Sequence, residues 1–364
     1  MINSVKKVIV KYNGTIVGYL AELSEGRIAF QYDDEWIKKG FSISPFSLPL
    51  KSEVFVNEKP LFSGLFGVFR DSLPDGWGEL LMNRMLAKKG VNPDRVSPIT
   101  KLSLVGDSGL GGLTYEPSQP FTNEENGVDL DELVLEVQKI LMDGDENSDL
   151  DRVYRLGGSS GGARPKAHIK IDNEEWIVKF PCRIDPPDVG EREYSANRLA
   201  ENCGINVSKY KLLPSKICSG YFGTKRFDRI GSKRVHMVSL SALLETTHRL
   251  PNLDYMHYFQ VIQAICVNPK ESLYEGFRRM CFNVLCFSKD DHGKNFAFLY
   301  DEDKGGYVLS PHYDITFTPD KYEHEMTVLG VGNPTEKELL ALAKKFKLSL
   351  KECARIITEI KEAK

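Results

Sequence analysis

The pattern of hydrophobic and polar positions changes along the chain. Residues 8–17 alternate between apolar and polar side chains around an Asn13-Gly14 turn, which is typical of a β-hairpin. From Ser239 onward the apolar residues recur at helical spacing, with one long apolar stripe over residues 273–285. The pattern therefore predicts an α+β chain that begins with β structure and ends mainly in helices.

In the middle of the chain, glycines and acidic residues indicate where the predicted elements begin and end. A helix is predicted to begin at Asp75 or Trp77 and to stop at Gly90. The acidic stretch 124–151 contains one amphipathic helical pattern, which we interpret as a solvated helix between two structural units. A glycine cluster over residues 156–171 then opens the next unit.

Composition excludes several classes of protein. The 364 residues are 41% hydrophobic and 27% charged, which excludes a disordered or collagen-like chain. The 48 Lys and Arg residues and 51 Asp and Glu residues give a net charge of −3, which argues against coating nucleic acid through bulk charge. There is no apolar run of about 18 residues, no secretory signal pattern and no CxxC pair among the 7 cysteines. We therefore expect a cytoplasmic protein with reduced thiols, no zinc site and no membrane span.

The glycine cluster and the strand after it are the first candidates for phosphate chemistry. Gly161 and Gly162 belong to the cluster, and Lys179 lies in the predicted strand 176–180. Glycines let backbone amides approach phosphate oxygens closely, and a strand lysine can reach the same phosphates. The cluster lacks the GxxxxGK[ST] spacing, so on its own it also fits a flexible surface loop beside an edge lysine.

A second group of polar residues lies between a helical pattern and a strand. Asp290 and Asn295 have the spacing of the aspartate and asparagine in the protein-kinase catalytic loop, where they orient the substrate hydroxyl and bind Mg²⁺. Asp314 follows the next predicted strands, and its carboxylate could bind the same cation. Separately, the two segments also fit a capped turn and a helix N-cap.

The order of these parts is more informative than any one of them. A glycine loop, a strand lysine, a helical glutamate, an Asp-x₄-Asn segment and a later aspartate follow one another as in protein kinases. Glu193 is the candidate partner of Lys179, with Glu191 as a rival, although helix N-termini favour acidic residues in any case. Together the parts predict phosphoryl transfer from ATP with Mg²⁺.

The chain also resembles the HipA family, the serine/threonine kinase toxins of bacterial toxin–antitoxin modules. The matching stretches are FSLPL (46–50), DSLPDGWGELLMNRML (71–86), GDSGLGGLTYEP (106–117), GGSSGGARPKAHI (157–169), EWIVKFP (175–181), EYSANRLAENCGINV (193–207), KRFDR (225–229), DDHGKN (290–295) and LSPHYDI (309–315). They span nearly the whole chain in the family's order, and a generic protein kinase would lack the N-terminal stretches.

The resemblance implies a fold and a domain organisation. The expected fold is α+β and protein-kinase-like, with a β-rich N-terminal subdomain and an all-helical C-terminal lobe. The expected domains are a HipA-type N-terminal subdomain at 1–120, a nucleotide-binding lobe with the glycine-rich loop at 121–228, and a helical catalytic lobe at 229–364.

The resemblance also implies residue roles. Asp290 is expected to be catalytic, Asn295 and Asp314 to bind Mg²⁺, and Lys179 to contact the phosphates. The other expected ATP-binding residues are Gly161, Gly162, Lys225, Arg226, Phe227, His292 and Tyr313, with backbone groups of 225–227 meeting adenine. Autophosphorylation is expected on Ser159, with Ser160 as a competitor, and is expected to eject the glycine loop and inactivate the kinase.

The implied function is that of an ATP- and Mg²⁺-dependent serine/threonine protein kinase, the toxin of a HipBA-like module. Its expected substrate is a translation component, such as an aminoacyl-tRNA synthetase. Its expected partner is a helix-turn-helix, HipB-like antitoxin, and any contact with DNA is expected to be made through that partner.

Two alternatives stay open. Asp290, His292 and Asn295 also resemble the catalytic loop of phosphoinositide kinases, which would make the chain a small-molecule or lipid kinase. The chain could instead be a non-catalytic regulator that binds an antitoxin on its operator. Its tail, residues 339–357, faintly resembles a helix-turn-helix, although an ordinary two-helix lobe fits better, and the retained kinase residues argue against this alternative.

Overall fold

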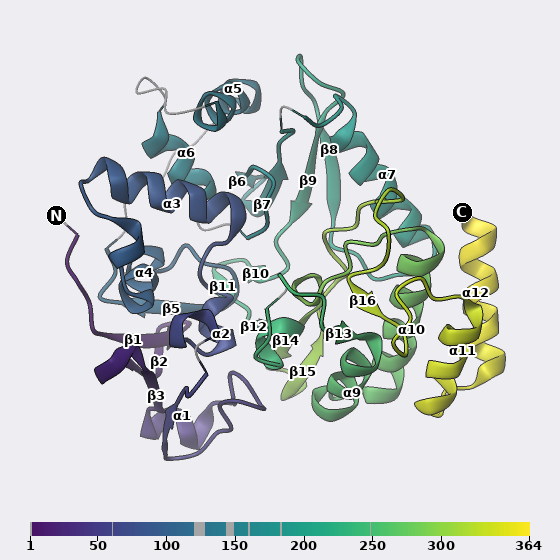
Figure 1. Cartoon of the computed structure of the whole chain (residues 1–364), viewed down its shortest axis with the longest axis horizontal. Helices are drawn as coiled ribbons and strands as arrows, with labels where there is room; N and C mark the ends of the chain where they lie inside the picture. The colour runs from purple at the N-terminus through teal and green to yellow at the C-terminus, as the bar shows by residue number, and fades with distance from the viewer. Residues whose placement is uncertain are drawn as a thin grey trace. The chain divides into compact units, whose positions relative to one another are not determined.

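The chain forms two compact units (Figure 1). The computed structural model describes residues 2–59, 61–119, 128–142, 149–158, 161–182, 184–247 and 249–364. Unit 1 comprises Met1–Gly190, Lys211–Val238 and Ala242–Glu245, and unit 2 comprises Glu191–Tyr210, Ser239–Ser241 and Thr246–Lys364. Unit 1 thus contains both the N-terminal part and the glycine-loop lobe, and the division into three domains stays a prediction.

Unit 1 begins with a five-stranded antiparallel sheet in the order β4-β3-β2-β1-β5. Its strands are β1 (Lys7–Tyr12), β2 (Thr15–Glu22), β3 (Ile28–Tyr32), β4 (Val54–Val56) and β5 (Leu113–Glu116). The β1–β2 turn has positive φ at Asn13 (46°) and Gly14 (84°), the backbone conformation that a tight hairpin requires. Val8 and Val10 are fully buried, so the hairpin predicted from the alternation of apolar residues is confirmed.

Short helices join and cover this sheet. They are η1 (Ser24–Gly26), α1 (Asp34–Lys39), η2 (Leu61–Gly64), α2 (Gly67–Arg70), α3 (Gly76–Lys88), η3 (Pro93–Arg95) and α4 (Pro98–Val105). The predicted helix near residue 75 is confirmed as α3. Asp75 has an extended backbone at its N-cap, and Gly90, with φ of 72°, follows its end.

A second sheet of unit 1 follows the glycine loop. Its order is β6-β7-β9-β8, formed by β6 (Lys166–Ile171), β7 (Glu174–Lys179), β9 (Tyr221–Lys225) and β8 (Tyr210–Leu213). A short ribbon of β10 (Arg229–Ile230) and β11 (Lys233–Arg234) comes next in the chain. The boundary between the two units falls within β12 (Met237–Ser239) and α8 (Leu240–Leu243).

The acidic stretch is more closely attached to unit 1 than the sequence suggested. It forms α5 (Leu130–Leu141) and the start of α6 (Leu150–Gly157), and α6 packs against α3 and β6. Asp131 accepts hydrogen bonds from the Ser215 hydroxyl (2.7 Å), the Tyr221 hydroxyl (2.7 Å) and the Lys216 N–H (2.9 Å). The predicted amphipathic helix is thus present as α5, with its apolar face buried, but it does not join two units, because the described residues on both sides of it belong to unit 1.

Unit 2 is mainly helical and is built around α10 (Pro269–Leu285). This helix packs against α9 (Tyr255–Ile265), α11 (Glu336–Lys345) and α12 (Leu350–Ala363), and α11 and α12 lie side by side at the C-terminus (Figure 1). The predicted stripe forms this core, since Leu273, Phe277 and Met280 are buried. Unit 2 also contains α7 (Val189–Asn202) from Glu191 onward.

The C-terminal lobe, which was expected to be all-helical, also contains strands. The antiparallel pair β14 (Ala297–Asp301) and β15 (Gly306–Leu309) lies within unit 2, as does the short parallel pair β13 (Leu253–Asp254) and β16 (Met326–Thr327). Strands β14 and β15 are short apolar runs rich in aromatic residues, FAFLY (296–300) and YVL (307–309), on either side of a polar turn. None of the described helices has the length and hydropathy that crossing a membrane requires.

Candidate functional site

The glycine loop lies between α6 and β6 and is bonded to the start of α3. The Gly162 N–H donates to Oδ1 of Asp75, and the Gly162 carbonyl accepts from the Trp77 N–H at 3.0 Å. Asp75 itself is buried. Ser159 and Ser160, the predicted autophosphorylation sites, lie outside the described residues.

Gly76 permits this contact because it has no side chain. Its φ is +46°, and a Cβ there would lie 2.5 Å from the Gly162 carbonyl oxygen and 2.7 Å from the Ala163 Cα. Any larger residue would have to displace the backbone of the glycine loop. The sequence pattern indicates Asp75 and Gly76 only as the start of a helix. Their contact with the glycine loop was not predicted, and the one feature that could have indicated it is the Asp-Gly pair directly before Trp77-Gly78.

The lysines of the second sheet have different surroundings. Lys166 and Lys179 are paired across β6 and β7. Lys166 is buried and donates to the Gly161 carbonyl, so its ammonium is engaged with the loop. Lys179 is half-buried, with Nζ 5.8 Å from the centre of the Phe222 ring. The assignment of Lys179 to the phosphates stays a prediction.

Strand β9 ends at Lys225, residues 226 and 227 follow it, and the Arg226 side chain is engaged elsewhere. Its guanidinium forms two bonds to Asp228, at 2.9 and 2.7 Å, and both side chains are buried. The Arg226 N–H donates to the Glu175 carbonyl at 2.8 Å. A contact between Arg226 and adenine would therefore have to use its backbone carbonyl.

Asp228 connects this strand end to the N-terminal part of unit 1. It accepts from Arg229 at 2.9 Å and from the Gly111 N–H at 2.7 Å, and Arg229 also donates to the Gly109 and Gly111 carbonyls. Burial alone would raise the pKa of Asp228, but the two guanidinium groups and the Gly111 N–H outweigh it and hold the pKa well below its ordinary value. The KRFDR motif is thus a buried ionic connection as well as a candidate adenine contact.

The Asp-x₄-Asn segment forms a fixed loop in unit 2. Residues Gly293–Asn295 make a single 3-10 turn, η4, and the Asn295 side-chain amide donates to the Asp290 carbonyl at 2.7 Å. That bond orients the side-chain amide of Asn295: its Nδ2 faces the Asp290 carbonyl, so its Oδ1 points away from that carbonyl. Asn295 is buried and Asp290 is half-exposed.

Asp314 is brought to the same end of a hairpin as Asn295. Strand β14 begins just after Asn295 and pairs antiparallel with β15, which ends shortly before Asp314. The Tyr313 hydroxyl donates to the Lys294 carbonyl and ties the segment after β15 to the catalytic loop. Asp314 has φ of 58°, a left-handed backbone that is uncommon outside glycine and that tends to occur at functional sites.

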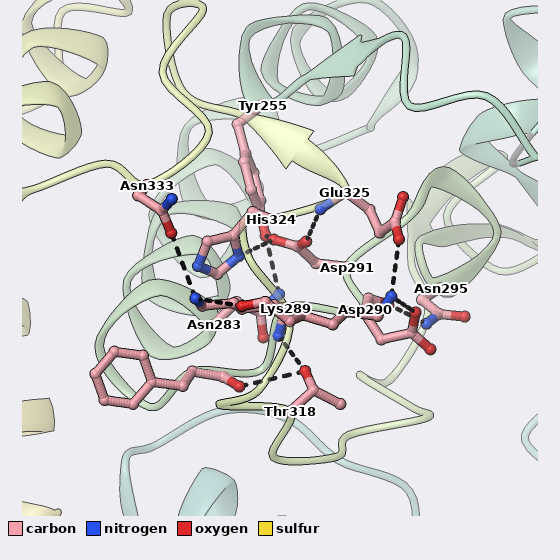
Figure 2. A network of polar contacts seen from close by, with 12 residues as sticks. Tyr255, Asn283, Lys289, Asp290, Asp291, Asn295, Thr318, His324, Glu325 and Asn333 are labelled. Atoms are coloured by element: carbon pink, nitrogen blue, oxygen red, sulfur yellow. Dashed lines mark hydrogen bonds and ion pairs between the residues drawn. The ribbon is translucent and has the colours of Figure 1, made fainter.

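Asp291, next to Asp290, is the centre of a buried polar network (Figure 2). Its carboxylate accepts from the Tyr255 hydroxyl at 2.7 Å and the Glu325 N–H at 3.0 Å, and it contacts His324 Nδ1 at 2.8 Å. Burial raises the pKa of Tyr255 well above its ordinary value, and Asp291 raises it further, so the phenol stays protonated and donates. Asp291 therefore fixes the backbone beside Asp290.

Lys289, on the other side of Asp290, contacts the same downstream segment. Its N–H donates to the Thr318 hydroxyl at 2.8 Å, and its ammonium donates to the Lys321 carbonyl at 2.8 Å. Lys321 in turn donates to Oδ1 of Asp290 at 2.5 Å. Neither Lys321 nor the partners of Asp291 were expected from the sequence, because no motif marks residues 318–333.

The remaining predicted residues lie in unit 2. Glu193 is buried in α7, whereas its rival Glu191 is exposed, which favours Glu193 as a lysine partner. His292 precedes η4 and is half-buried, as is Tyr313. Lys179, the glycine loop and residues 225–227 belong to unit 1, so their assembly with the unit 2 residues into one site stays a prediction.

The candidate ligands, Asn295 and Asp314, suit a Mg²⁺ ion that is bound together with phosphate oxygens better than a metal ion bound by protein side chains alone. Among the described residues no group of three or more His, Cys, Asp or Glu side chains could hold a metal ion. Asn295 offers an amide oxygen and Asp314 a carboxylate, and Mg²⁺ in nucleotide sites is held by one or two such ligands together with phosphate oxygens. The residues present therefore fit a cation that arrives with a nucleotide.

The fold and these loops define an α+β chain with the parts of a protein-kinase-like fold. Family models match the chain over residues 8–116, for the HipA N-terminal domain, and over residues 158–364, for the HipA-like C-terminal domain. The chain belongs to the HipA family. The resemblance and the fold class predicted from the sequence are confirmed.

Individual relatives agree with this assignment. The chain is 25% identical over 356 residues to the "Putative kinase Y4mE" of Sinorhizobium fredii, covering 86% of this chain and 78% of the relative. It is 25% identical over 180 residues to a "Putative kinase" of Haemophilus influenzae, covering 43% of this chain and 52% of the relative. HipA in a complex with HipB and operator DNA, from the toxin antitoxin system of Shewanella oneidensis MR-1, has a similar fold. That comparison gives a TM-score of 0.75 at 19% identity and covers 97% of this chain and 88% of the other.

Proposed function

We propose that this protein is an ATP- and Mg²⁺-dependent serine/threonine protein kinase. The observation that carries the proposal is the loop at Asp290, where the Asn295 amide is fixed by the Asp290 carbonyl and Asp291 and Lys289 hold the flanking backbone. A catalytic carboxylate needs such a fixed position, because phosphoryl transfer depends mainly on positioning and charge stabilisation. The names of the two bacterial relatives support the same activity.

Each residue has a definite task in this proposal. Asp290 orients the acceptor hydroxyl and takes its proton as the hydroxyl oxygen attacks. Asn295 and Asp314 bind the cation, which supplies charge neutralisation at the phosphates when bound. Lys179, oriented by Glu193, and the amides of Gly161 and Gly162 hold the phosphates. His292, Tyr313 and backbone groups of residues 225–227 line the rest of the nucleotide site.

The biological role follows from the family. We propose that the protein is the cytoplasmic toxin of a HipBA-like module and that it pairs with a helix-turn-helix antitoxin, through which it would reach DNA. Its acceptor would be a protein of the translation apparatus, such as an aminoacyl-tRNA synthetase. Autophosphorylation at Ser159 or Ser160 would limit its activity.

Phosphate transfer by the purified protein tests the activity. With ATP and Mg²⁺ we expect the intact mass to increase by one phosphate, with the modification mapping to Ser159 or Ser160. Asp290→Asn should reduce transfer by about 10²–10⁴-fold. Asp303→Asn, an exposed aspartate in the β14–β15 turn, is the matched control and should transfer at the wild-type rate. No mass gain in the wild type, or equal transfer by Asp290→Asn, would count against the kinase.

The acceptor class is tested separately. Radiolabelled ATP with protein extracts, phosphoinositide vesicles and small hydroxyl metabolites should label protein alone. Labelling confined to lipid or metabolite would favour the small-molecule or lipid kinase instead. Tight antitoxin binding by a protein that transfers no phosphate to any acceptor would favour the non-catalytic regulator.

A further inference from the structure

Lys321 forms an ion pair with the candidate catalytic carboxylate. Its ammonium lies 2.5 Å from Oδ1 of Asp290 and 2.8 Å from Oε1 of Glu325. The side chains of Lys321 and Asp290 are 36% and 39% exposed, so the pair lies at a surface that solvent and a substrate can reach. A surface ion pair alone contributes little to stability, and its interest lies in which carboxylate it involves.

The backbone on both sides of Lys321 is fixed to the catalytic loop. The Lys321 carbonyl accepts from the Lys289 ammonium at 2.8 Å, and Thr318 accepts from the Lys289 N–H at 2.8 Å. On the other side, Asp291 accepts from the Glu325 N–H at 3.0 Å and contacts His324 (Figure 2). The two neighbours of Asp290 in the sequence therefore bind the two flanks of Lys321.

The far end of the same segment is fixed as well. Asp254 accepts from the Thr327 hydroxyl at 2.7 Å and the Gly330 N–H at 2.8 Å, and β16 pairs with β13. Residues 318–333 thus have anchors on the catalytic loop and on the start of α9. With its backbone held in this way, Lys321 needs to order only its own side chain to meet Asp290, which lowers the entropic cost of the contact.

We propose that Lys321 is a positioning residue that holds the Asp290 carboxylate oriented toward the acceptor hydroxyl. This inference rests on the proposed kinase function. Glu325 holds the ammonium from the other side, so that Lys321 is fixed rather than free to swing into solvent. Burial lowers the pKa of Lys321, but its bonds to Asp290 and Glu325 outweigh this and raise the pKa, so the side chain stays charged at neutral pH.

The positive charge of Lys321 also has to be accommodated when Asp290 takes up the proton during transfer. As the acceptor oxygen forms its bond to phosphorus, the proton moves to Asp290 and the bond from phosphorus to the leaving oxygen breaks. Lys321 is left beside a neutral carboxyl group at that moment. Its ammonium can then remain with Glu325, so the proton transfer leaves no unpaired ammonium at the site.

Substitution of Lys321 tests the proposal through the split between kcat and KM. Lys321→Gln should lower kcat by about 10–100-fold, because a misplaced catalytic group costs up to about 10²-fold, while KM for ATP stays within about twofold. Lys321→Arg keeps the charge and should recover most of kcat. Lys304→Gln is the matched control, since Lys304 forms an exposed ion pair with Asp301 at 3.1 Å in the β14–β15 turn. It should behave as wild type.

A double variant separates a positioning role from a structural one. If Lys321 acts through Asp290, Lys321→Gln should cause no further loss of transfer in the Asp290→Asn background. In the nucleotide-free protein the Tm of the double variant should lie close to that of Asp290→Asn, because only the partly exposed pair of Lys321 with Glu325 is lost in addition.

Several results would overturn the proposal. These are an unchanged kcat in Lys321→Gln, a full additional loss in the Asp290→Asn background, or loss of folded structure in both the Gln and Arg variants. A wild-type protein that transfers no phosphate would instead reject the proposed kinase function. The two failures are therefore distinguishable.

Discussion

The glycine loop and the catalytic loop are supported by different parts of the chain. In unit 1 the glycine loop is bonded to Asp75 and Trp77, and the Asp75–Gly162 bond spans 87 residues of sequence. In unit 2 the catalytic loop is bonded to the segment that follows it, and the Lys321–Asp290 bond spans 31 residues. The candidate nucleotide side thus depends on the N-terminal part of unit 1, whereas the candidate catalytic side depends on residues 318–333.

The groups that form these bonds also differ. Asp291 and Lys289 each make several bonds to residues 318–333, and both side chains are buried. In the glycine loop, Gly162 is bonded to Asp75 and Trp77 at the start of α3, and Lys166 donates to the Gly161 carbonyl. The bonds of the Asp290 loop are therefore made to one following segment, whereas the described part of the glycine loop is held from the start of α3 and from Lys166.

The largest effect is expected where the N-terminal part of unit 1 meets the end of β9. Asp228→Asn should lower the free energy of unfolding by about 3–5 kcal/mol, because it leaves the buried Arg226 and Arg229 without their anion. Urea unfolding measures the change, with the exposed Asp94→Asn as control. A loss below about 1 kcal/mol would show that the nucleotide side does not depend on this ionic connection.

The same carboxylate predicts a pH dependence. The pKa of Asp228 is held below its ordinary value of 3.8 in the folded protein, so its ionisation stabilises the fold above that pH. This contribution should decline as the pH falls below about 4. Urea midpoints between pH 5 and 3 should fall more steeply for the wild type than for Asp228→Asn. Parallel curves for the two proteins would contradict the assignment.

In unit 2 the corresponding test is Asp291→Asn. The amide cannot accept from Tyr255, His324 and the Glu325 N–H as the carboxylate does, so we expect a loss of about 2–3 kcal/mol in unfolding free energy. The rate of phosphate transfer should fall as well, because residues 318–333 would lose their alignment with Asp290. Asp303→Asn is the control. Normal transfer in a destabilised Asp291→Asn protein would separate stability from alignment and weaken the comparison.

Gly76→Ala tests the close approach to the glycine loop. The positive φ and the 2.5 Å approach of a Cβ to the Gly162 carbonyl should together cost about 2 kcal/mol. Gly90→Ala is a matched control, because Gly90 has φ of +72° but a Cβ at that position would meet no heavy atom within 4 Å. It should lose only about 1 kcal/mol, from the backbone alone. Equal losses in the two variants would show that the contact with the loop carries no strain.

The smallest effect on stability is expected from Asp75→Asn. Loss of the carboxylate acceptor for the Gly162 N–H should lower the free energy of unfolding by about 1 kcal/mol and make the glycine loop less ordered. KM for ATP should rise several-fold, with kcat nearly unchanged, and limited proteolysis near residue 162 should become faster. If kcat falls while KM is unchanged, Asp75 does not act through nucleotide binding.

Local patterns predicted local structure well. The hairpin around Asn13, the helix that ends at Gly90 and the apolar stripe of α10 each depend on residues close together in the sequence, and all three are present. The Asp-x₄-Asn spacing likewise coincides with an ordered loop between α10 and β14, whose role in binding a cation stays a prediction. In these cases spacing and turn chemistry were sufficient.

Contacts between distant residues could not be predicted in the same way. No local pattern indicates that Lys321 meets Asp290 or that Asp75 meets Gly162, because both contacts depend on packing between separate segments. Asp131 lies in a stretch whose pattern is typical of a solvated helix, yet it accepts three bonds near β9. The resemblance assigned backbone groups of residues 225–227 to adenine, and it could not reveal that the Arg226 side chain is buried against Asp228.

The β14–β15 hairpin has a practical consequence for engineering. Asn295 and Asp314 adjoin one end of the hairpin, and the exposed turn residues 302–305 lie at the other. The spacing between the two candidate ligands is set by strand register and is independent of the length of the turn. A short peptide tag or fluorescent probe inserted after Asp303 should therefore leave the cation site intact and allow this unit to be followed in living cells.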